Sequence, residues 1–392
     1  MIQEKLKNCI QEALRALSIT ADDIHLEHPV DLSFGDYSSN VALSYAKEMK
    51  MKPRDLAEKI VNKIREQGIK KLEKVEVAGA GFINFFLSKE FFAESLGEGI
   101  KQGERFGANK ALRGKKIMIE YTDPNPFKEF HIGHLMSNTI GEAISRIVEF
   151  HGAEVKRACY QGDVGLHTAK AIYGAIKNGE PKTAKDWGEV YAKGSAEYED
   201  DIDAKKEIDE LNKKIYNRSD AEITALYYSG RKISLEAFEE MYKRLGTHFD
   251  YYFFESEIAK PGLETVTRFL DKGVFEKSEG AVVFKGEKYN PSLHTRVYIT
   301  SQGLPTYEAK ELGLHIVKEE TYPADTSIVI TANEQDGVFA VGLEAFRQID
   351  PELADKVKHI SHGLLKLPTG KMSSRKGNVL TAQGLIGDVE KL

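Results

Sequence analysis

Two histidines three positions apart give the sequence its clearest chemical signal. His131 and His134 follow a loop that contains Pro124 and Pro126, and they precede a run of apolar residues at helical spacing. Because this loop can neither continue a strand nor enter a helix interior, both histidines are expected in or just before a first helical turn. Unpaired backbone N–H groups and the positive end of the helix dipole favour an anion there. The pattern therefore predicts a phosphate site.

A second cluster of charge lies near the end of the sequence. Residues 368–378, PTGKMSSRKGN, combine glycines and serines with lysine and arginine side chains, of which Lys371 is the first, and have little ability to form regular structure. Histidines at a helix start and a lysine loop at the end of a parallel sheet are suited to nucleotidyl transfer. The histidines could also be zinc ligands or core residues. No third ligand lies at a useful spacing for zinc, and the polar neighbours Lys128 and Glu129 oppose a core role.

A strand, a loop and a helix must position these histidines. Residues 117–119 form a short apolar run that suits a buried parallel strand, and apolar residues at helical spacing between 140 and 147 predict the helix. Residues 154–160 supply the next strand, so the connection is βαβ and the sheet parallel. Ligands of such sheets lie at the carboxyl ends of the strands. Asp163 sits at such an end and is interpreted as a turn former.

The length of 392 residues predicts at least two domains. Residues 1–105 alternate between helical and strand patterns and are expected to form a small α+β domain. Residues 106–392 are expected to form the α/β domain that holds the site. Charged helices at about 175–245 are interpreted as an insertion on the outside of its sheet, and residues 359–367 as its last strand before the lysine loop.

The composition excludes some classes of protein. A net charge of −6 with 30% charged residues argues against a general nucleic-acid coat protein, although it allows a local basic site. Cys9 and Cys159 are far apart and form no metal-ligand pattern, so the sequence supports neither a disulfide framework nor a zinc module. This cysteine usage is typical of a protein in a reducing compartment. Without a membrane-length apolar run, we expect a soluble, cytoplasmic protein, and we expect it to be a monomer.

Several motifs together resemble the class I aminoacyl-tRNA synthetases, and the arginyl-tRNA synthetases in particular. HIGH and KMSSR resemble the two signatures of the class, and EYTDPNPFKEFHIGH, QGDVG, FDYYFFES, NEQ and GKMSSRKGN resemble the arginyl family. Residues 34–60 and 77–88 resemble its N-terminal tRNA-binding module. The resemblance covers essentially the whole chain. It implies a Rossmann-like, parallel-sheet class I synthetase catalytic domain with a helical insertion, preceded by a small α+β tRNA-binding domain.

The resemblance also implies a reaction. Arginine and ATP would form arginyl-adenylate, and the arginyl group would pass to the terminal adenosine of tRNA(Arg). His131 and His134 would donate to ATP phosphates, Gly133 would leave room for adenine, and Lys371 would reach the α- and β-phosphates. The other implied ATP-binding residues are Met372, Ser373 and Ser374. Mg²⁺ is implied as a companion of the phosphates, held mainly by ATP.

One position departs from the class signature. The usual KMSKS has a second lysine where this chain has Ser374. Lys128, three residues before His131, resembles a lysine that some family members place there, and we expect it to supply the missing charge. Arg375 and Lys376 are rival cations, although Lys376 is more readily interpreted as a solvated loop residue.

A guanidinium requires carboxylates placed for forked hydrogen bonds and an aromatic wall. Tyr307 and Glu311 have the i, i+4 spacing of a tyrosine and an aspartate in the family, with one more methylene in this chain. Glu311 could equally be a surface residue paired with Lys310 or Lys318. The remaining residues assigned to the arginine site are Asn125, Glu120, Glu255 and Gln335.

The tRNA partner is inferred from the resemblance alone, because acids are as frequent as bases in the N-terminal stretch. Asn84 is a possible base contact. Family members continue beyond Leu392 into a helical anticodon-binding domain, so we expect a truncated form with reduced activity. Two alternatives remain: another class I synthetase, or a non-catalytic tRNA-binding paralogue.

Overall fold

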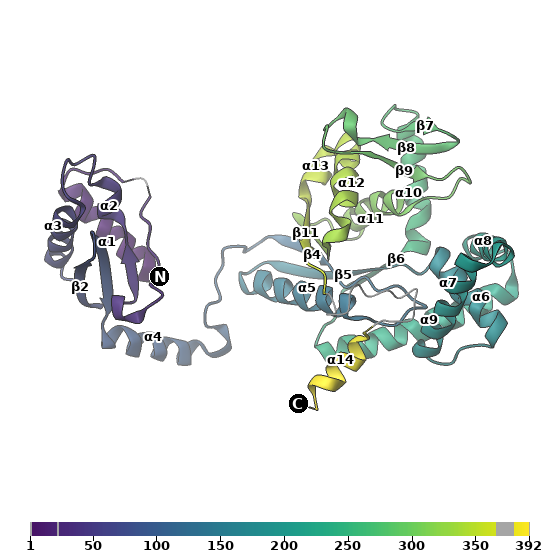
Figure 1. Cartoon of the computed structure of the whole chain (residues 1–392), viewed down its shortest axis with the longest axis horizontal. Coiled ribbons are helices and arrows are strands. Elements are labelled where there is room, and N and C mark those ends of the chain that lie inside the picture. The colour runs from purple at the N-terminus through teal and green to yellow at the C-terminus, as the bar shows by residue number, and fades with distance from the viewer. Residues whose placement is uncertain (1, 22, 366–379, 392) are drawn as a thin grey trace. The chain divides into compact units, whose positions relative to one another are not determined.

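The computed structural model describes residues 2–21, 23–365 and 380–391. The chain divides into two compact units, Met1–Gly107 and Ala108–Leu392, and each is described by itself (Figure 1). Among the described residues, no helix is both long and apolar enough to span a membrane.

The first unit packs helices against a three-stranded antiparallel sheet of order β1-β3-β2. Its helices are α1 (Ile2–Ala16), α2 (Val41–Tyr45), α3 (Pro53–Glu66) and α4 (Lys89–Gln102), its strands are β1 (Tyr37–Ser39), β2 (Leu72–Ala78) and β3 (Phe82–Leu87), and its 3₁₀ turns are η1 (Leu32–Phe34) and η2 (Gly103–Arg105). Leu6, Ile10 and Leu14 recur on one face of α1 and are fully buried. Pro53 occupies the first turn of α3, where its missing N–H costs nothing.

Asn84 lies in the middle of β3 and has a structural role. It is directly opposite Ser38 in β1, and its Oδ1 accepts a hydrogen bond from the Ser38 hydroxyl at 2.9 Å. Because only 2% of Asn84 is exposed, its interpretation as a possible base contact is wrong. Phe85 next to it is fully buried, as expected of a core strand.

The second unit is built on a five-stranded parallel sheet of order β11-β10-β4-β5-β6. The strands are β4 (Lys116–Glu120), β5 (Glu154–Gln161), β6 (Tyr251–Phe254), β10 (Thr326–Ala332) and β11 (Val357–His362). Helix α5 (Ile132–Phe150) joins β4 to β5, so the predicted βαβ connection is confirmed. The last strand ends at His362, before the predicted end at 367.

Further elements of the second unit lie after β6 in the chain. The helices are α10 (Glu255–Leu270), α11 (Tyr307–Thr321), α12 (Asp336–Ile349), α13 (Pro351–Lys356) and α14 (Ala382–Val389), the small antiparallel sheet is formed by β7 (Glu276–Ser278), β8 (Ala281–Lys285) and β9 (Thr295–Ile299), and the 3₁₀ turns are η3 (Gly286–Lys288) and η4 (Asn333–Gln335). Helices α10 and α11 pack closely, since a Cβ at Gly262 would lie 2.3 Å from the Ala309 carbonyl oxygen.

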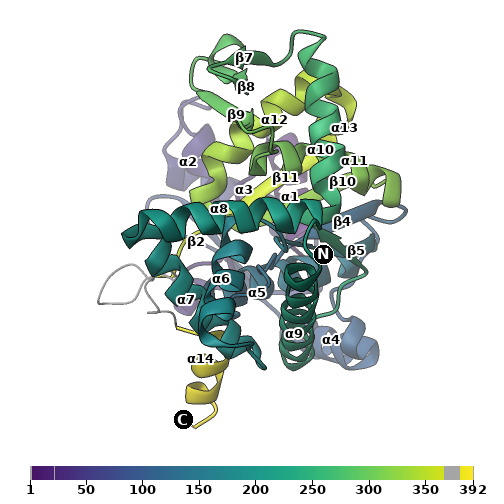
Figure 2. The ribbon, with the colours of Figure 1, turned by 90° about the vertical axis from the view of Figure 1, so that its right-hand side faces the viewer.

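Four helices between β5 and β6 form a bundle with its own core (Figure 2). They are α6 (Leu166–Asn178), α7 (Ala184–Asp200), α8 (Ile202–Asn217) and α9 (Ala221–Leu245). The charged sequence suggested that these helices lie only on the outside of the sheet. The structure shows that they also contact the loop before the histidines. The buried Trp187 of the bundle meets Phe127 edge-on, with ring centroids 5.1 Å apart, and a Cβ at Gly230 would lie 2.5 Å from the Phe127 ring. The bundle therefore fixes the loop that precedes the two histidines.

Candidate active site

The N-terminus of α5 is capped by imidazole nitrogens. His131 is the N-cap, and its Nδ1 accepts hydrogen bonds from the backbone N–H groups of Gly133 at 3.1 Å and His134 at 3.4 Å. In return, His134 Nδ1 accepts from the His131 backbone N–H at 3.4 Å. The two rings stack with centroids 3.7 Å apart. This reciprocal arrangement is a capping box built from two histidines.

The cap determines which ring atoms remain for a ligand. A neutral imidazole has one donor and one acceptor nitrogen, so a ring whose Nδ1 accepts carries its hydrogen on Nε2. Burial, and then the Lys128 charge, lower the pKa of His131 to about 4. The pKa of His134 is also lowered, by burial and then by His131 and Lys128. Both rings are therefore neutral at pH 7, with an Nε2–H to offer as a donor.

The loop between β4 and α5 holds strained backbone. Thr122, Asp123 and Phe127 adopt positive φ angles of 80°, 44° and 67°, a conformation that costs about 1–3 kcal/mol for residues other than glycine. Hydrogen bonds compensate: the Thr122 N–H donates to Ser137 Oγ at 3.1 Å, and the Phe127 N–H donates to Ser234 Oγ at 2.9 Å. Ser137 belongs to α5 and Ser234 to the bundle, so both elements hold the loop.

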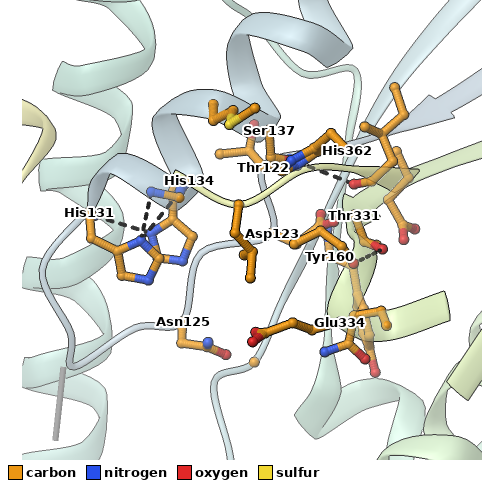
Figure 3. Close-up of a pocket in the computed structure, with 18 of the residues that line it drawn as sticks. Thr122, Asp123, Asn125, His131, His134, Ser137, Tyr160, Thr331, Glu334 and His362 are labelled. Carbon is orange, nitrogen blue, oxygen red and sulfur yellow. Dashed lines mark hydrogen bonds between the residues drawn. The ribbon is translucent and has the colours of Figure 1, made fainter. Parts of the chain in front are cut away.

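A cavity of about 380 Å³ opens at the carboxyl ends of the strands, where the parallel sheet predicts a ligand. In Figure 3, His131 and His134 lie on one side of it, and Thr331 and Glu334 lie on the other. Of the residues predicted from sequence, those that line it are Glu120, Asn125, His131, Gly133, His134, Glu255, Tyr307 and Gln335. Gly162 also lines it, and a side chain would not fit at this position, because a Cβ would lie 2.2 Å from Asn125 Oδ1.

Buried acids beside the cavity are paired with lysines from α11. Lys318 pairs with Glu120, and Lys310 pairs with Glu255. Glu311 does not line the cavity, but it is buried next to Tyr307 and Glu120. The alternative that Glu311 is a surface residue paired with one of these lysines is therefore wrong.

Two carboxyl groups near Glu120, those of Glu311 and Asp123, have raised pKa values. Burial, and then the charge of Glu120, raise the pKa of Glu311 to about 8. The same two causes, in the same order, raise the pKa of Asp123 well above its ordinary value. A cation that enters the cavity would favour both ionised carboxylates.

Asp163 is the centre of a buried hydrogen-bond network, so its interpretation as a turn former is wrong. Its carboxylate accepts from the Tyr227 hydroxyl at 2.9 Å and Arg231 Nε at 2.8 Å, both on α9. It also accepts from the Ser256 backbone N–H at 2.9 Å and the Ser256 hydroxyl at 2.7 Å, at the start of α10. Asp163 thus ties the end of β5 to the bundle and to the helix that carries Glu255.

Of the cations predicted from the sequence, the structure describes only Lys128. Lys128 does not line the cavity, and its Nζ lies 4.9 Å from the centroid of the Tyr191 ring. Its charge still acts on both histidines, as their lowered pKa values show. The predicted residues Lys371, Met372, Ser373 and Ser374, and the rival cations Arg375 and Lys376, lie outside the described residues.

The described chain on the two sides of residues 366–379 lies at the cavity or next to the start of α5. His362 and Leu365 line the cavity before this segment. After it, Leu380 accepts a hydrogen bond from the Ile132 N–H at 3.1 Å, and the Ala382 N–H donates to the Phe130 carbonyl at 2.9 Å. The flank before the lysine-containing segment thus lines the same cavity as the histidines, and the flank after it is hydrogen-bonded to the residues next to His131.

Sequence reasoning missed Lys318 as a site residue. It lies seven positions after Glu311 and eleven after Tyr307, which places the three on one face of a helix. That spacing was the available signal. The burial of Lys318 was not visible, because charged residues on a helix are usually exposed.

Comparison with known proteins gives matches along both units. The model of the family described as tRNA synthetases class I (R), catalytic domain, matches residues 98–391. The arginyl tRNA synthetase N terminal domain matches residues 4–87. The arginine–tRNA ligase of Treponema denticola is 31% identical over 383 residues, which cover 95% of this chain and 64% of the relative. That of Lactobacillus delbrueckii is 32% identical over 395 residues, covering 97% and 68%.

Solved structures agree on the fold. Thermus thermophilus arginyl-tRNA synthetase aligns with a TM-score of 0.70 at 21% identity and covers 100% of this chain and 70% of its own. The Plasmodium falciparum enzyme aligns with a TM-score of 0.69 at 20% identity, covering 100% and 67%. The chain belongs to the class I arginyl-tRNA synthetase family. It spans 64% and 62% of the two Treponema relatives, which is less than two thirds of their length.

Replacing Gly133 with alanine tests the histidine cap. A Cβ there would lie 2.9 Å from His131 Cε1, so the ring must move and its Nε2–H must turn away. We expect Gly133→Ala to bind ATP, used as a phosphate-bearing probe, at least about fivefold more weakly, with little loss of folding stability because alanine favours a helix. Isothermal titration calorimetry and a denaturant melt measure the two effects.

Gly342→Ala is the matched control, since Gly342 lies in α12 and its added Cβ has no neighbour within 4 Å. It should bind ATP as the wild type does. Equal ATP affinity in both variants would show that the position of the His131 ring does not matter for the phosphate site.

Proposed function

We propose that the chain carries the arginine-activating site of an arginine–tRNA ligase. In this reaction arginine and ATP form arginyl-adenylate and pyrophosphate, and the arginyl group then passes to the terminal adenosine of tRNA(Arg). The observation that carries the proposal is the position of two neutral Nε2–H donors at a helix N-terminus on one wall of a cavity with buried acids beside it. Family membership supports the same assignment.

The phosphates of ATP are assigned to the N-terminus of α5. His131 and His134 donate from Nε2–H to phosphate oxygens, and the helix dipole adds to the attraction. Because both rings are neutral, they stabilise negative charge on the phosphates without exchanging protons with them. Gly133 keeps the His131 ring in place. Mg²⁺ enters with ATP, bound to its phosphates.

The amino acid is assigned to the acid-rich part of the cavity. Glu120 and Glu311 attract the guanidinium, Tyr307 forms the aromatic wall, and Asn125 contacts the α-amino or carboxylate group. Glu255 and Gln335 complete the lining of this part of the cavity. The Glu255 carboxylate already forms an ion pair with Lys310. The arginine carboxylate is ionised at neutral pH, so it attacks the α-phosphorus without a general base, and alignment supplies most of the rate.

The cations act on the charge that develops as pyrophosphate leaves. Lys128 supplies a charge beside the histidines, and Lys371 reaches the phosphates from its segment, together with Met372, Ser373 and Ser374. The first unit binds tRNA(Arg), in keeping with its match to the family's N-terminal domain.

Ligand-dependent stabilisation tests the proposed substrate. A ligand that binds the folded state at about a hundred times its Kd stabilises it by about 2.7 kcal/mol. With ATP present, arginine should raise the melting temperature, and the other amino acids should not. Glu120→Gln is the matched variant: it should keep the response to ATP and lose most of the response to arginine. Stabilisation by a different amino acid would assign another substrate, and no response to ATP would indicate a non-catalytic paralogue.

Lys128→Ala tests the proposed replacement of the second signature lysine. We expect ATP–pyrophosphate exchange, measured with arginine and tRNA, to fall at least about tenfold because one cation near the reacting phosphates is lost. The folding midpoint should change little. Lys232→Ala, which removes an exposed lysine on α9, is the control and should leave exchange unchanged. Near-normal exchange in Lys128→Ala would assign the missing charge to another cation.

A further inference from the structure

Helix α11 supplies internal counter-ions to two acids that line the cavity. Lys310 pairs with Glu255, with side-chain exposures of 7% and 12%, and Lys318 pairs with Glu120, with exposures of 3% and 2%. Glu311 lies between the two lysines in sequence. Within the described part of the chain it forms no ion pair of its own. Helix α11, all of which the structure describes, thus provides a counter-ion for Glu120 and for Glu255 but none for Glu311.

The Lys318–Glu120 pair is poorly explained by folding alone. Bringing two charges out of water carries a desolvation cost that their attraction often fails to exceed, and apolar residues of similar size usually serve a core as well. Glu120 is at the carboxyl end of β4 and lines the cavity, whereas Lys318 does not. The pair therefore has one member that a ligand can contact and one that lies behind it.

We propose that Lys318 is a positioning residue for the cationic side chain of the amino-acid substrate, because its ammonium pairs with Glu120 at the cavity wall and sets the net charge of the acid cluster formed by Glu120, Asp123 and Glu311. This inference rests on the proposed function. Lys318 acts through Glu120 and does not itself touch the substrate.

The charge count gives this role a measurable consequence. Glu120, Asp123 and Glu311 bring three carboxyl groups to the cluster, and Lys318 brings an ammonium. Because the pKa of Glu311 is raised to about 8, the empty cluster retains a proton near neutral pH, and the pKa of Asp123 is shifted in the same direction. An arriving cation favours the ionised forms and releases protons, so affinity for it rises as the pH increases towards about 8.

Other ionisable groups facing the cluster do not titrate in this range or are already paired. Tyr160 at the end of β5 and Tyr307 on α11 have raised pKa values because they are buried. Burial and the Lys318 charge lower the pKa of His315 to about 3. Burial raises the pKa of Glu255 on α10, and its ion pair with Lys310 opposes this shift. The α-amino group of free arginine titrates equally for every variant, so a difference in pH dependence between the wild type and Lys318→Met reports the carboxyl cluster.

The experiment measures arginine and ATP binding by calorimetry between about pH 6.5 and about pH 8.5 for the wild type, Lys318→Met and Lys318→Arg. In Lys318→Met, Glu120 is buried without a cation, which favours its protonated form. We expect arginine affinity to fall about tenfold or more at neutral pH, with a steeper dependence on pH, because arginine must displace a further proton. ATP affinity should stay within about twofold, and Lys318→Arg should recover most of the arginine affinity.

A matched control removes a different lysine next to α11. Lys356→Met breaks the half-buried pair between Lys356 and Glu319 and should leave arginine binding and its pH dependence unchanged.

The outcomes separate this inference from the proposed function. If the wild type binds no arginine, the proposed function fails and this inference with it. If the wild type binds arginine and Lys318→Met binds it with equal affinity and the same pH dependence, only the role of Lys318 is overturned. Loss of both ATP and arginine binding in Lys318→Met would also overturn it, since Lys318 would then serve the fold.

Discussion

The hydrogen bonds at the start of α5 are the constraint on which the site depends. Backbone N–H groups of a first helical turn need acceptors, and here imidazole Nδ1 atoms provide them. Because each neutral ring has one acceptor, its use inside the helix leaves Nε2–H for a ligand. Gly133 and the helical bundle help to keep these histidine rings in position. A side chain at Gly133 would displace the His131 ring, and the bundle anchors Phe127 in the preceding loop.

The acid-rich part of the cavity depends on an electrostatic balance. Buried carboxylates are costly unless a cation compensates them, and α11 compensates Glu120 and Glu255 while leaving Glu311 without an ion pair among the described residues. The site thus combines neutral donors for an anion with acids for a cation. ATP and arginine present these two charges, and the parallel sheet brings both walls to the carboxyl ends of its strands.

Local patterns were sufficient to predict the strand, loop and helix around His131, since the prolines and the apolar spacing lie within one short stretch. Long-range partners were not predictable. Asp163 bonds to Tyr227, Arg231 and Ser256, which lie 64, 68 and 93 residues away, so its sequence context showed only a turn. The burial of Lys318 was not predicted for a related reason. Charged residues on a helix usually face solvent, and Glu120, its partner in the ion pair, is distant in the sequence.

The most direct test of the central claim is ATP–pyrophosphate exchange by this chain with each amino acid in turn, with and without tRNA(Arg). Exchange requires the phosphate site at the N-terminus of α5 and the acid-rich part of the cavity to act together in one reaction. Binding measurements alone do not show this. We expect exchange with arginine and with no other amino acid, and we expect tRNA to increase the rate. Exchange with a different amino acid, or ATP and arginine binding without exchange under either condition, would contradict the central claim.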